Sequence, residues 1–266
     1  MFEFTFMQHA FIAGGIIALI CGIMSVFVVT RRCAFAAHAL SHISLTGASG
    51  AMLIGLSAMT GQLVITIIAG FFMALVGDKI WKNDVAIGIV LTFFLGLGAY
   101  FLFLYQSGYS GSVMSIFFGN ILSVSTNQIF VLIGLTCVIL IGLSIMARPL
   151  FISGLDPIFA AAKRIPQYRL NIAFFILLAI TVSMACQVVG ILLVFALLVG
   201  PGAIALQWAN GFYKTILLSL MVALIIVWFS IGLSFYINQL PTSVSITTLM
   251  SLIYGFGLLK QYITRG

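Results

Sequence analysis

The chain has 266 residues, of which 63% are hydrophobic and 6% are charged, and its formal net charge is +7. Its mean hydropathy of +1.31 lies far above the balance of a water-soluble globule. These values exclude a soluble domain, and with it the nucleic-acid binding that such a charge would otherwise suggest. They predict a polytopic membrane protein whose Lys and Arg residues mark cytoplasmic loops.

Charged residues fall in clusters that are separated by uncharged runs, each longer than the roughly 20 apolar residues that cross a bilayer. Helices are expected, because an isolated lipid-facing strand cannot satisfy its backbone and the alternating pattern of a barrel is missing. We therefore predict an all-α transmembrane bundle that forms one domain over residues 1–266, with about eight or nine spans. The predicted spans are 8–30, 35–57, 61–77, 85–105, 128–147, 170–187, 190–209, 214–237 and 243–260.

The distribution of basic residues favours nine crossings over eight. With the start of the first span outside, every basic cluster falls on the cytoplasmic side, as the positive-inside rule expects. Residues 170–210 are predicted to hold two helices joined by a turn near Gly190, and the alternative is one long helix with a re-entrant piece. On the outer side, 107–112 is predicted to be a turn and 113–122 a short interfacial helix.

In the first span, His9 stands near the outer end and is predicted to be an interfacial, solvated histidine. The four cysteines lie singly in apolar runs without CxxC spacing, so we interpret them as small buried hydrophobic residues and not as disulfide or metal partners. They are Cys21, Cys33, Cys137 and Cys186.

In the second predicted span, His38 and His42 are spaced i, i+4, which places both imidazoles on one face of a helix near mid-membrane. A polar, metal-capable group is costly to place in hydrocarbon and is more often functional than accidental. The HxxxH pattern lacks the Glu of a zinc-protease motif. Two readings therefore remain open, a metal site and helix-packing hydrogen bonds.

Between the fifth and sixth predicted spans lies a second polar segment that runs from Asp156 to Lys163. Pro157 suits the first position of a helix and Asp156 suits the cap before it, so a short amphipathic helix is predicted at the cytoplasmic surface. Such a helix is either a docking site for a partner or an ordinary interfacial loop helix.

Further along, residues 189–203 combine glycines with Pro201 inside an apolar run, a pattern found where helices move or line a path and equally in plain packing. The chain has no GxxxxGK[ST] phosphate loop and no catalytic constellation of Ser, His and Asp or of paired carboxylates. We therefore expect no enzyme and no ATP hydrolysis in this chain. The lack of intramembrane carboxylates argues against a proton-driven secondary transporter.

Five collinear motifs cover nearly the whole chain and together resemble the permease subunit of bacterial ABC importers for zinc, manganese or iron. VVTRR with ALSH and TG is similar to the family's "LRR…DALSHA…PG" signature, and the other four motifs are similar to "D-x-x-I-G-I", "F-G-x-I-L-x-V-S", "D-P-E-x-A" and "V-G-x-L-L-V…P". In this sequence they are residues 28–32 with 39–42 and 46–47, then DVAIGI at 84–89, FGNILSVS at 118–125, LDPIFA at 155–160, and VGILLV at 189–194 followed by Pro201.

The resemblance implies a fold of the metal-chelate (type II) importer permeases in the bacterial inner membrane, and a homodimer in which each copy contributes His38 and His42 to the ion path. It implies an ATPase subunit docked on Asp156, Pro157, Phe159, Ala160 and Lys163, and an extracytoplasmic metal-binding protein. No cofactor is expected apart from the transported ion.

Two departures from the family pattern bear on these expectations. The family usually has Asp where this chain has His38, and an acidic residue where it has Ile158. Because carboxylate suits manganese and imidazole suits zinc, the first change favours zinc, with manganese or iron as further candidates. A permease for a chelated metal such as haem or a siderophore, and a stand-alone cation carrier, are the alternatives. The sequence leaves open the choice of metal and whether the ion contacts His38 and His42 directly.

Overall fold

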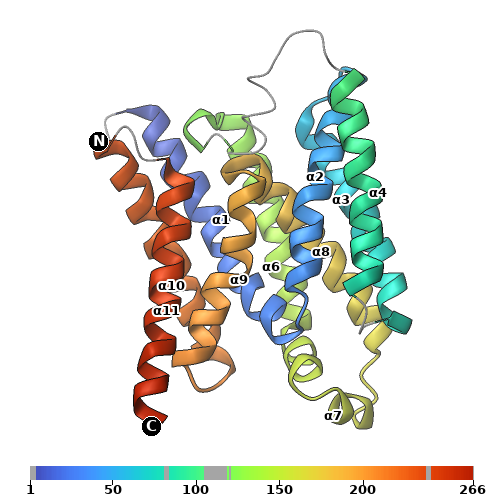
Figure 1. Ribbon diagram of the computed structural model, residues 1–266, viewed down its shortest axis with the longest axis vertical. Coiled ribbons are helices and arrows are strands. Elements are labelled where there is room, and N and C mark those ends of the chain that lie inside the picture. The colour runs from blue at the N-terminus through green and yellow to red at the C-terminus, as the bar shows by residue number, and fades with distance from the viewer. Residues whose placement is uncertain (1–3, 81–83, 105–118, 120, 238–240, 266) are drawn as a thin grey trace.

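The computed structural model describes residues 4–80, 84–104, 119, 121–237 and 241–265, and over these ranges it contains helices and no strand (Figure 1). The predicted outer turn at 107–112 and most of the predicted interfacial helix at 113–122 lie outside the described residues. The helices are α1 (Thr5–Thr30), α2 (Ala34–Leu53), α3 (Ala58–Ile80), α4 (Asp84–Leu104), η1 (Ile121–Ser123), α6 (Thr126–Leu155), α7 (Pro157–Ala162), α8 (Gln167–Val189), α9 (Ile191–Trp208), α10 (Phe212–Tyr236) and α11 (Thr242–Arg265).

The all-α bundle predicted from the sequence is confirmed. Eight of the described helices are long and apolar enough to cross a membrane. A further helix, α2, has 20 residues, enough to span about 30 Å at 1.5 Å per residue, but it is more polar than the others because it carries two histidines and several hydroxyl side chains. Most of α2 is buried among other helices, so these polar groups are not all presented to lipid.

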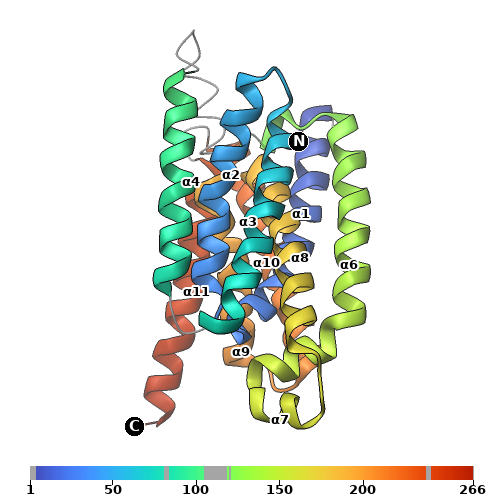
Figure 2. The same ribbon diagram turned by 90° about the vertical axis from the view of Figure 1, so that its right-hand side faces the viewer.

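Successive long helices run in opposite directions, so the start of α1 and the end of α11 lie at opposite ends of the bundle (Figure 1). At one end of the bundle α7 lies beneath α6 and α8 (Figure 2), and basic residues lie at the helix ends on this side of the bundle. Arg31 directly follows α1, and Arg169 and Lys214 lie in the first turns of α8 and α10. By the positive-inside rule this end faces the cytoplasm.

The two-helix prediction for residues 170–210 holds, since α8 and α9 are separated by Gly190 alone. Gly190 has a φ of 86°, a conformation that glycine adopts without the steric cost of a Cβ. Helix α6 extends beyond the predicted end of the fifth span at residue 147, because it continues through Arg148 and Pro149 to Leu155. Proline removes one helical hydrogen bond but does not stop this helix.

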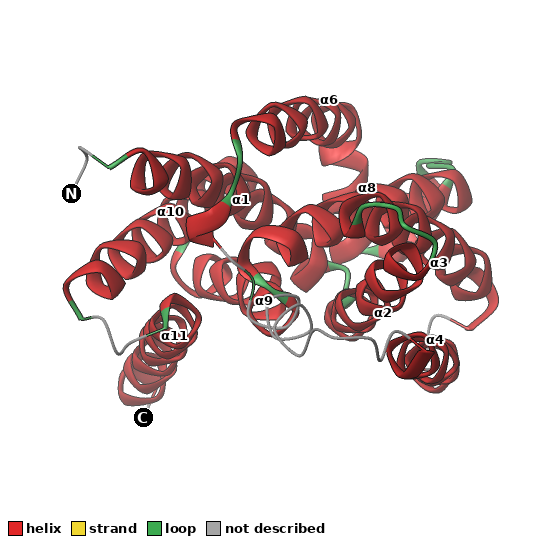
Figure 3. Ribbon diagram, turned by 90° about the horizontal axis from the view of Figure 1, so that it is seen from above, coloured by secondary structure: helices red, strands yellow, loops and turns green. Residues whose placement is uncertain are grey.

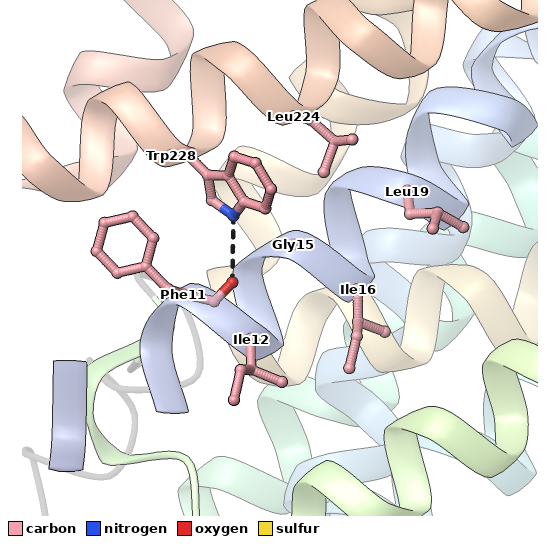
Figure 4. A pocket seen from close by; sticks show the side chains of 7 residues that line it. All are labelled: Phe11, Ile12, Gly15, Ile16, Leu19, Leu224 and Trp228. Atoms are coloured by element: carbon pink, nitrogen blue, oxygen red, sulfur yellow. Dashed lines mark hydrogen bonds between the residues drawn. The ribbon is translucent and has the colours of Figure 1, made fainter. Parts of the chain in front are cut away.

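Helices α1 and α8 form the centre of the bundle, and α1 packs closely against α10. The Ser219 hydroxyl donates to the Gly22 carbonyl at 2.6 Å across this contact. Nearer the outer end, the indole nitrogen of Trp228 donates to the Phe11 carbonyl at 3.2 Å beside Gly15 (Figure 4). A Cβ on Gly15 would lie 3.1 Å from that nitrogen, so the glycine leaves room for the indole.

Helix α2 is held on two sides by close backbone contacts. A Cβ added to Gly47 would lie 2.8 Å from the Gly61 carbonyl carbon of α3, so these helices touch through their glycines. Toward α4, the Thr46 hydroxyl donates to the Phe94 carbonyl at 2.6 Å. Seen from above, α9 and α2 lie next to each other between α11 and α4 (Figure 3). This row of four helices forms one side of the molecule.

Candidate metal centre and cytoplasmic helix

The two histidines predicted as metal ligands lie together on α2. The ring centroids of His38 and His42 are 4.6 Å apart and the rings are nearly perpendicular, at 79°. Both residues are half-buried. The His38 ring also lies against Phe195 of α9, with a centroid distance of 5.0 Å. The i, i+4 spacing therefore places both imidazoles on one face of α2, close enough for one ion to meet a nitrogen from each ring.

The polar residues on the buried part of α2 already have partners. The Ser41 hydroxyl donates to the Ala37 carbonyl at 3.0 Å, and the Ser44 hydroxyl donates to the Ser41 carbonyl at 2.7 Å. These bonds to the preceding turn satisfy side chains that would otherwise be costly in a dry interior.

Two imidazoles are an incomplete set for a divalent ion. Zinc sites in proteins usually have four ligands, and three protein ligands when a position stays open. Within the described residues there is no group of three or more His, Cys, Asp or Glu side chains that could hold a metal. A single copy of the described structure thus supplies His38 and His42 and no third side chain of these types.

The side of the molecule that carries the pair is apolar around it. Phe35 of α2 and Phe195 of α9 are each 37% exposed, and Leu192 of α9 is 53% exposed. Half-buried imidazoles among such residues would meet lipid if nothing covered them, and a polar group in hydrocarbon is costly. The composition of this side therefore suits a contact with another protein surface.

The predicted cytoplasmic helix is present as α7. It begins at Pro157, and the Asp156 carboxylate caps it by accepting a hydrogen bond from the Phe159 backbone N–H at 2.9 Å. Ala160 is fully buried and fixes one face of the helix. The Phe159 ring is exposed, with the Lys163 ammonium 5.1 Å from its centroid.

Ile158, at 83% exposure, stands out on this short helix. Because α7 lies at the cytoplasmic end of the bundle, this exposed apolar side chain is outside the hydrocarbon core of the bilayer. Together with Phe159 it gives α7 an apolar tip, as a docking surface for a partner requires.

Sequence reasoning missed the packing role of Arg31, which it assigned to membrane topology and to the motif at residues 28–32. This residue is 3% exposed, donates a hydrogen bond to the Asn171 side-chain oxygen of α8, and lies 5.1 Å from the centroid of the Phe174 ring. Its side chain also packs against Gly154, near the end of α6. Burial lowers the pKa of the Arg31 guanidinium. Arg31 thereby ties the end of α1 to both helices that flank α7, a role for which the sequence contains no local signal.

Two smaller predictions differ from the structure. His9 is half-buried and its Nδ1 lies 3.1 Å from the Val124 carbonyl oxygen, so it links α1 to the segment after η1 and is not simply solvated. Cys137 is exposed on α6, whereas Cys21, Cys33 and Cys186 are buried as predicted. An apolar cysteine on a helix that faces lipid has no need of burial within the protein.

Comparisons with known proteins agree with the family suggested by the motifs. The sequence model of the ABC 3 transport family matches residues 3–261. The chain is 32% identical over 211 residues to "Manganese transport system membrane protein MntC" of Halalkalibacterium halodurans, covering 79% of this chain and 72% of the relative. It is 30% identical over 267 residues to "Manganese import system permease protein ScaB" of Streptococcus gordonii, covering 99% and 95%.

Solved structures show the same architecture. "PsaBC from Streptococcus pneumoniae in complex with Fab" matches with a TM-score of 0.83 and 27% identity, over 96% of this chain and 91% of that one. A protein titled "An inward-facing conformation of a putative metal-chelate type ABC transporter" matches with a TM-score of 0.68 and 13% identity, over 95% and 85%. The second likeness concerns the fold alone.

Proposed function

The chain belongs to the ABC 3 transport family, and we propose that it is the membrane-spanning subunit through which an ATP-driven importer carries divalent transition metal ions. The protein is a multi-pass permease of the bacterial inner membrane and not itself an enzyme. In such an importer the energy comes from a separate ATPase subunit. The identity of the ion, the residues that handle it and the partners are inferred below.

The observation that carries the proposal is the pair His38 and His42, whose ring centroids lie 4.6 Å apart. Counted from the start of α2 at Ala34, the pair lies roughly 6 to 12 Å along the helix, inside the membrane-spanning part. We infer that the transported ion passes the two imidazoles. A transient relay suits transport, because an ion that is bound too tightly is not released.

A second copy of the chain would complete this set of ligands. If two copies meet on the side formed by α11, α9, α2 and α4 (Figure 3), His38 and His42 of both copies come together and lipid is excluded from all four rings. Four imidazoles match the tetrahedral coordination that zinc prefers. A two-fold arrangement of identical subunits is also the commonest form of oligomer.

Zinc is the ion favoured by the ligand chemistry, because neutral imidazole nitrogen suits zinc whereas carboxylate oxygen suits manganese. The resemblance to the family pattern implies that a carboxylate usually stands at the position of His38. Manganese is the second candidate, since relatives that match this chain are named as manganese transport proteins. Iron is compatible with imidazole ligands as well.

The ATPase subunit is proposed to dock on α7 through Asp156, Pro157, Phe159, Ala160 and Lys163. This assignment is supported by the exposed Phe159, by the buried Ala160 that anchors the helix, and by the single residue that separates α7 from α6. An extracytoplasmic metal-binding protein is proposed to deliver the ion at the opposite end of the bundle.

The test is ATP-dependent uptake of labelled zinc, manganese and iron into liposomes that contain the permease and its ATPase. The variant His38→Ala with His42→Ala should abolish uptake while the complex still assembles. His9→Asn is the matched control, because it removes an imidazole elsewhere and retains a side chain that can bond the Val124 carbonyl. Normal uptake by the double variant would reject the role of the pair, and faster uptake of manganese than of zinc would reject the preference for zinc.

Docking on α7 is tested by co-purification. Asp156→Ala with Phe159→Ala should reduce the amount of ATPase retained by the permease, because the helix loses its cap and an exposed ring. Asn210→Ala, at an exposed position in the neighbouring α9–α10 connection, serves as control. Unchanged retention by the double variant counts against the assignment.

A further inference from the structure

A groove of about 450 Å³ opens between α6 and α10 at the cytoplasmic end of the bundle, with α1 forming its floor. Most of its lining is apolar, with Phe27 of α1, Leu140 and Leu143 of α6, and Ile216 of α10 among the lining residues. An apolar groove within the membrane-spanning part of the bundle is suited to binding a hydrocarbon chain.

The cytoplasmic mouth of this groove is polar and positively charged. Arg148 and Tyr213 both line it, and the Arg148 Nη2 donates to the Tyr213 hydroxyl at 2.9 Å. Lys214 follows Tyr213 directly and is exposed. Helix α10 begins next to them after Gly211, which provides no side-chain cap, so its first backbone N–H groups add positive potential.

The depth of Arg148 agrees with a position at the border of the hydrocarbon region. Helix α6 starts at Thr126, so Arg148 lies roughly 33 Å along it, whereas the hydrocarbon core of a bilayer is about 30 Å thick. The apolar part of the groove therefore lies at the level of acyl chains, and the charged mouth lies at the level of lipid phosphates.

We propose that this groove binds an anionic phospholipid of the cytoplasmic leaflet, with an acyl chain between α6 and α10 and the phosphate at Arg148 and Lys214. The occupant follows from charge complementarity, because basic pockets between membrane-spanning helices on the cytoplasmic side bind anionic head groups. The groove beside Trp228 makes an internal contrast (Figure 4). The residues that line it are Phe11, Ile12, Gly15, Ile16, Leu19, Leu224 and Trp228, none of them charged, so it has no means of selecting a head group.

The experiment is a lipid titration of the purified permease–ATPase complex, followed by native mass spectrometry, with phosphatidylglycerol and phosphatidylcholine of identical acyl chains. The wild-type complex should retain phosphatidylglycerol in preference. Arg148→Gln should lower the affinity for phosphatidylglycerol about fivefold and leave that for phosphatidylcholine unchanged, since one basic residue near the surface contributes about that factor. Arg169→Gln is the matched control, because Arg169 is an exposed arginine at the same end that does not line the groove.

A second pair of variants tests the acyl-chain part of the groove. Ser144→Phe places a ring in the groove, whereas Val138→Phe places one on the lipid-exposed surface of α6 outside it. Only Ser144→Phe should reduce retention of phosphatidylglycerol. Equal retention of the two lipids by the wild type, or an equal effect of Arg148→Gln and Arg169→Gln, would overturn the proposal. The proposal would also be overturned if the ATPase subunit covered Arg148 and thereby displaced the lipid.

Discussion

The close contact between α2 and α3 predicts a large effect from adding one methyl group. In Gly47→Ala, the new Cβ would lie 2.8 Å from the Gly61 carbonyl carbon and 3.0 Å from the Gln62 Cα. Both are backbone atoms, which cannot rotate away as a side chain can. Carbon atoms pack at roughly 3.5 to 4.0 Å, so the two helices must separate by about 1 Å.

The cost of this separation exceeds the gain in helix propensity. Overpacking of a well-filled contact costs roughly 1 to 3 kcal/mol, and more where backbone atoms must move, whereas replacing a mid-helix glycine with alanine gains at most about 1 kcal/mol. We expect a net loss of about 1 to 2 kcal/mol in the free energy of unfolding, which lowers the thermal midpoint by roughly 2 to 8 °C in a chain of this size. Because Gly47 lies five residues after His42, metal uptake should fall as well.

The assay compares thermal unfolding in detergent and metal uptake of Gly47→Ala with those of Gly134→Ala. Gly134 is the control because it also lies inside a long helix, α6, but a Cβ there would meet nothing within 4 Å. Gly134→Ala should keep or slightly raise the thermal midpoint. The reasoning is refuted if the two variants unfold at the same temperature and transport equally.

Three further outcomes are expected. Burial raises the pKa of the Cys33 thiol to about 11, so only about 0.1% of it is thiolate at pH 8. When the other cysteines are alanine, iodoacetamide labelling of Cys33, measured by mass spectrometry, should therefore rise roughly tenfold per pH unit between about pH 7 and 9. Rapid labelling at pH 7 would contradict this. Ser125→Ala removes the capping box of α6 and should lower the free energy of unfolding by about 1 kcal/mol, as measured by thermal unfolding. Ser125→Asn should retain most of the stability, because asparagine can also cap a helix. Trp228→Phe removes the bond to the Phe11 carbonyl, and a loss of about 1 kcal/mol is expected; unfolding at the wild-type temperature would show that the bond contributes nothing.

Structural features that depend on residues close together in the sequence could be predicted. The uncharged runs indicated the spanning helices, the positive φ at Gly190 falls where a turn was expected, and the cap of α7 at Asp156 follows from the Asp-Pro pair. The continuation of α6 past Arg148 was missed, because an arginine and a proline normally mark the end of a span. A helix that leaves the membrane at its cytoplasmic end can carry both.

Contacts between distant residues could not be predicted. The i, i+4 spacing placed His38 beside His42, but nothing local indicated that Phe195 would pack against His38. The burial of Arg31 against Asn171 was equally hidden, since an arginine after a span usually points into water. Such pairings depend on how the helices are arranged around α1 and α8, which the pattern of hydropathy along the chain does not encode.

The length of α6 has a mechanical consequence. Its 30 residues measure roughly 45 Å, and Asp156 alone joins it to α7. Pro149 removes one backbone hydrogen bond of α6 near its cytoplasmic end, so a displacement of α7 would be shared between bending at this point and tilting of the longer stretch 126–148. The other end of α6 begins after the cap at Ser125, and Ile129 is buried in its first turn at the opposite surface of the bundle. The part of a displacement at α7 that passes this proline would reach the opposite surface of the membrane through the backbone of a single helix.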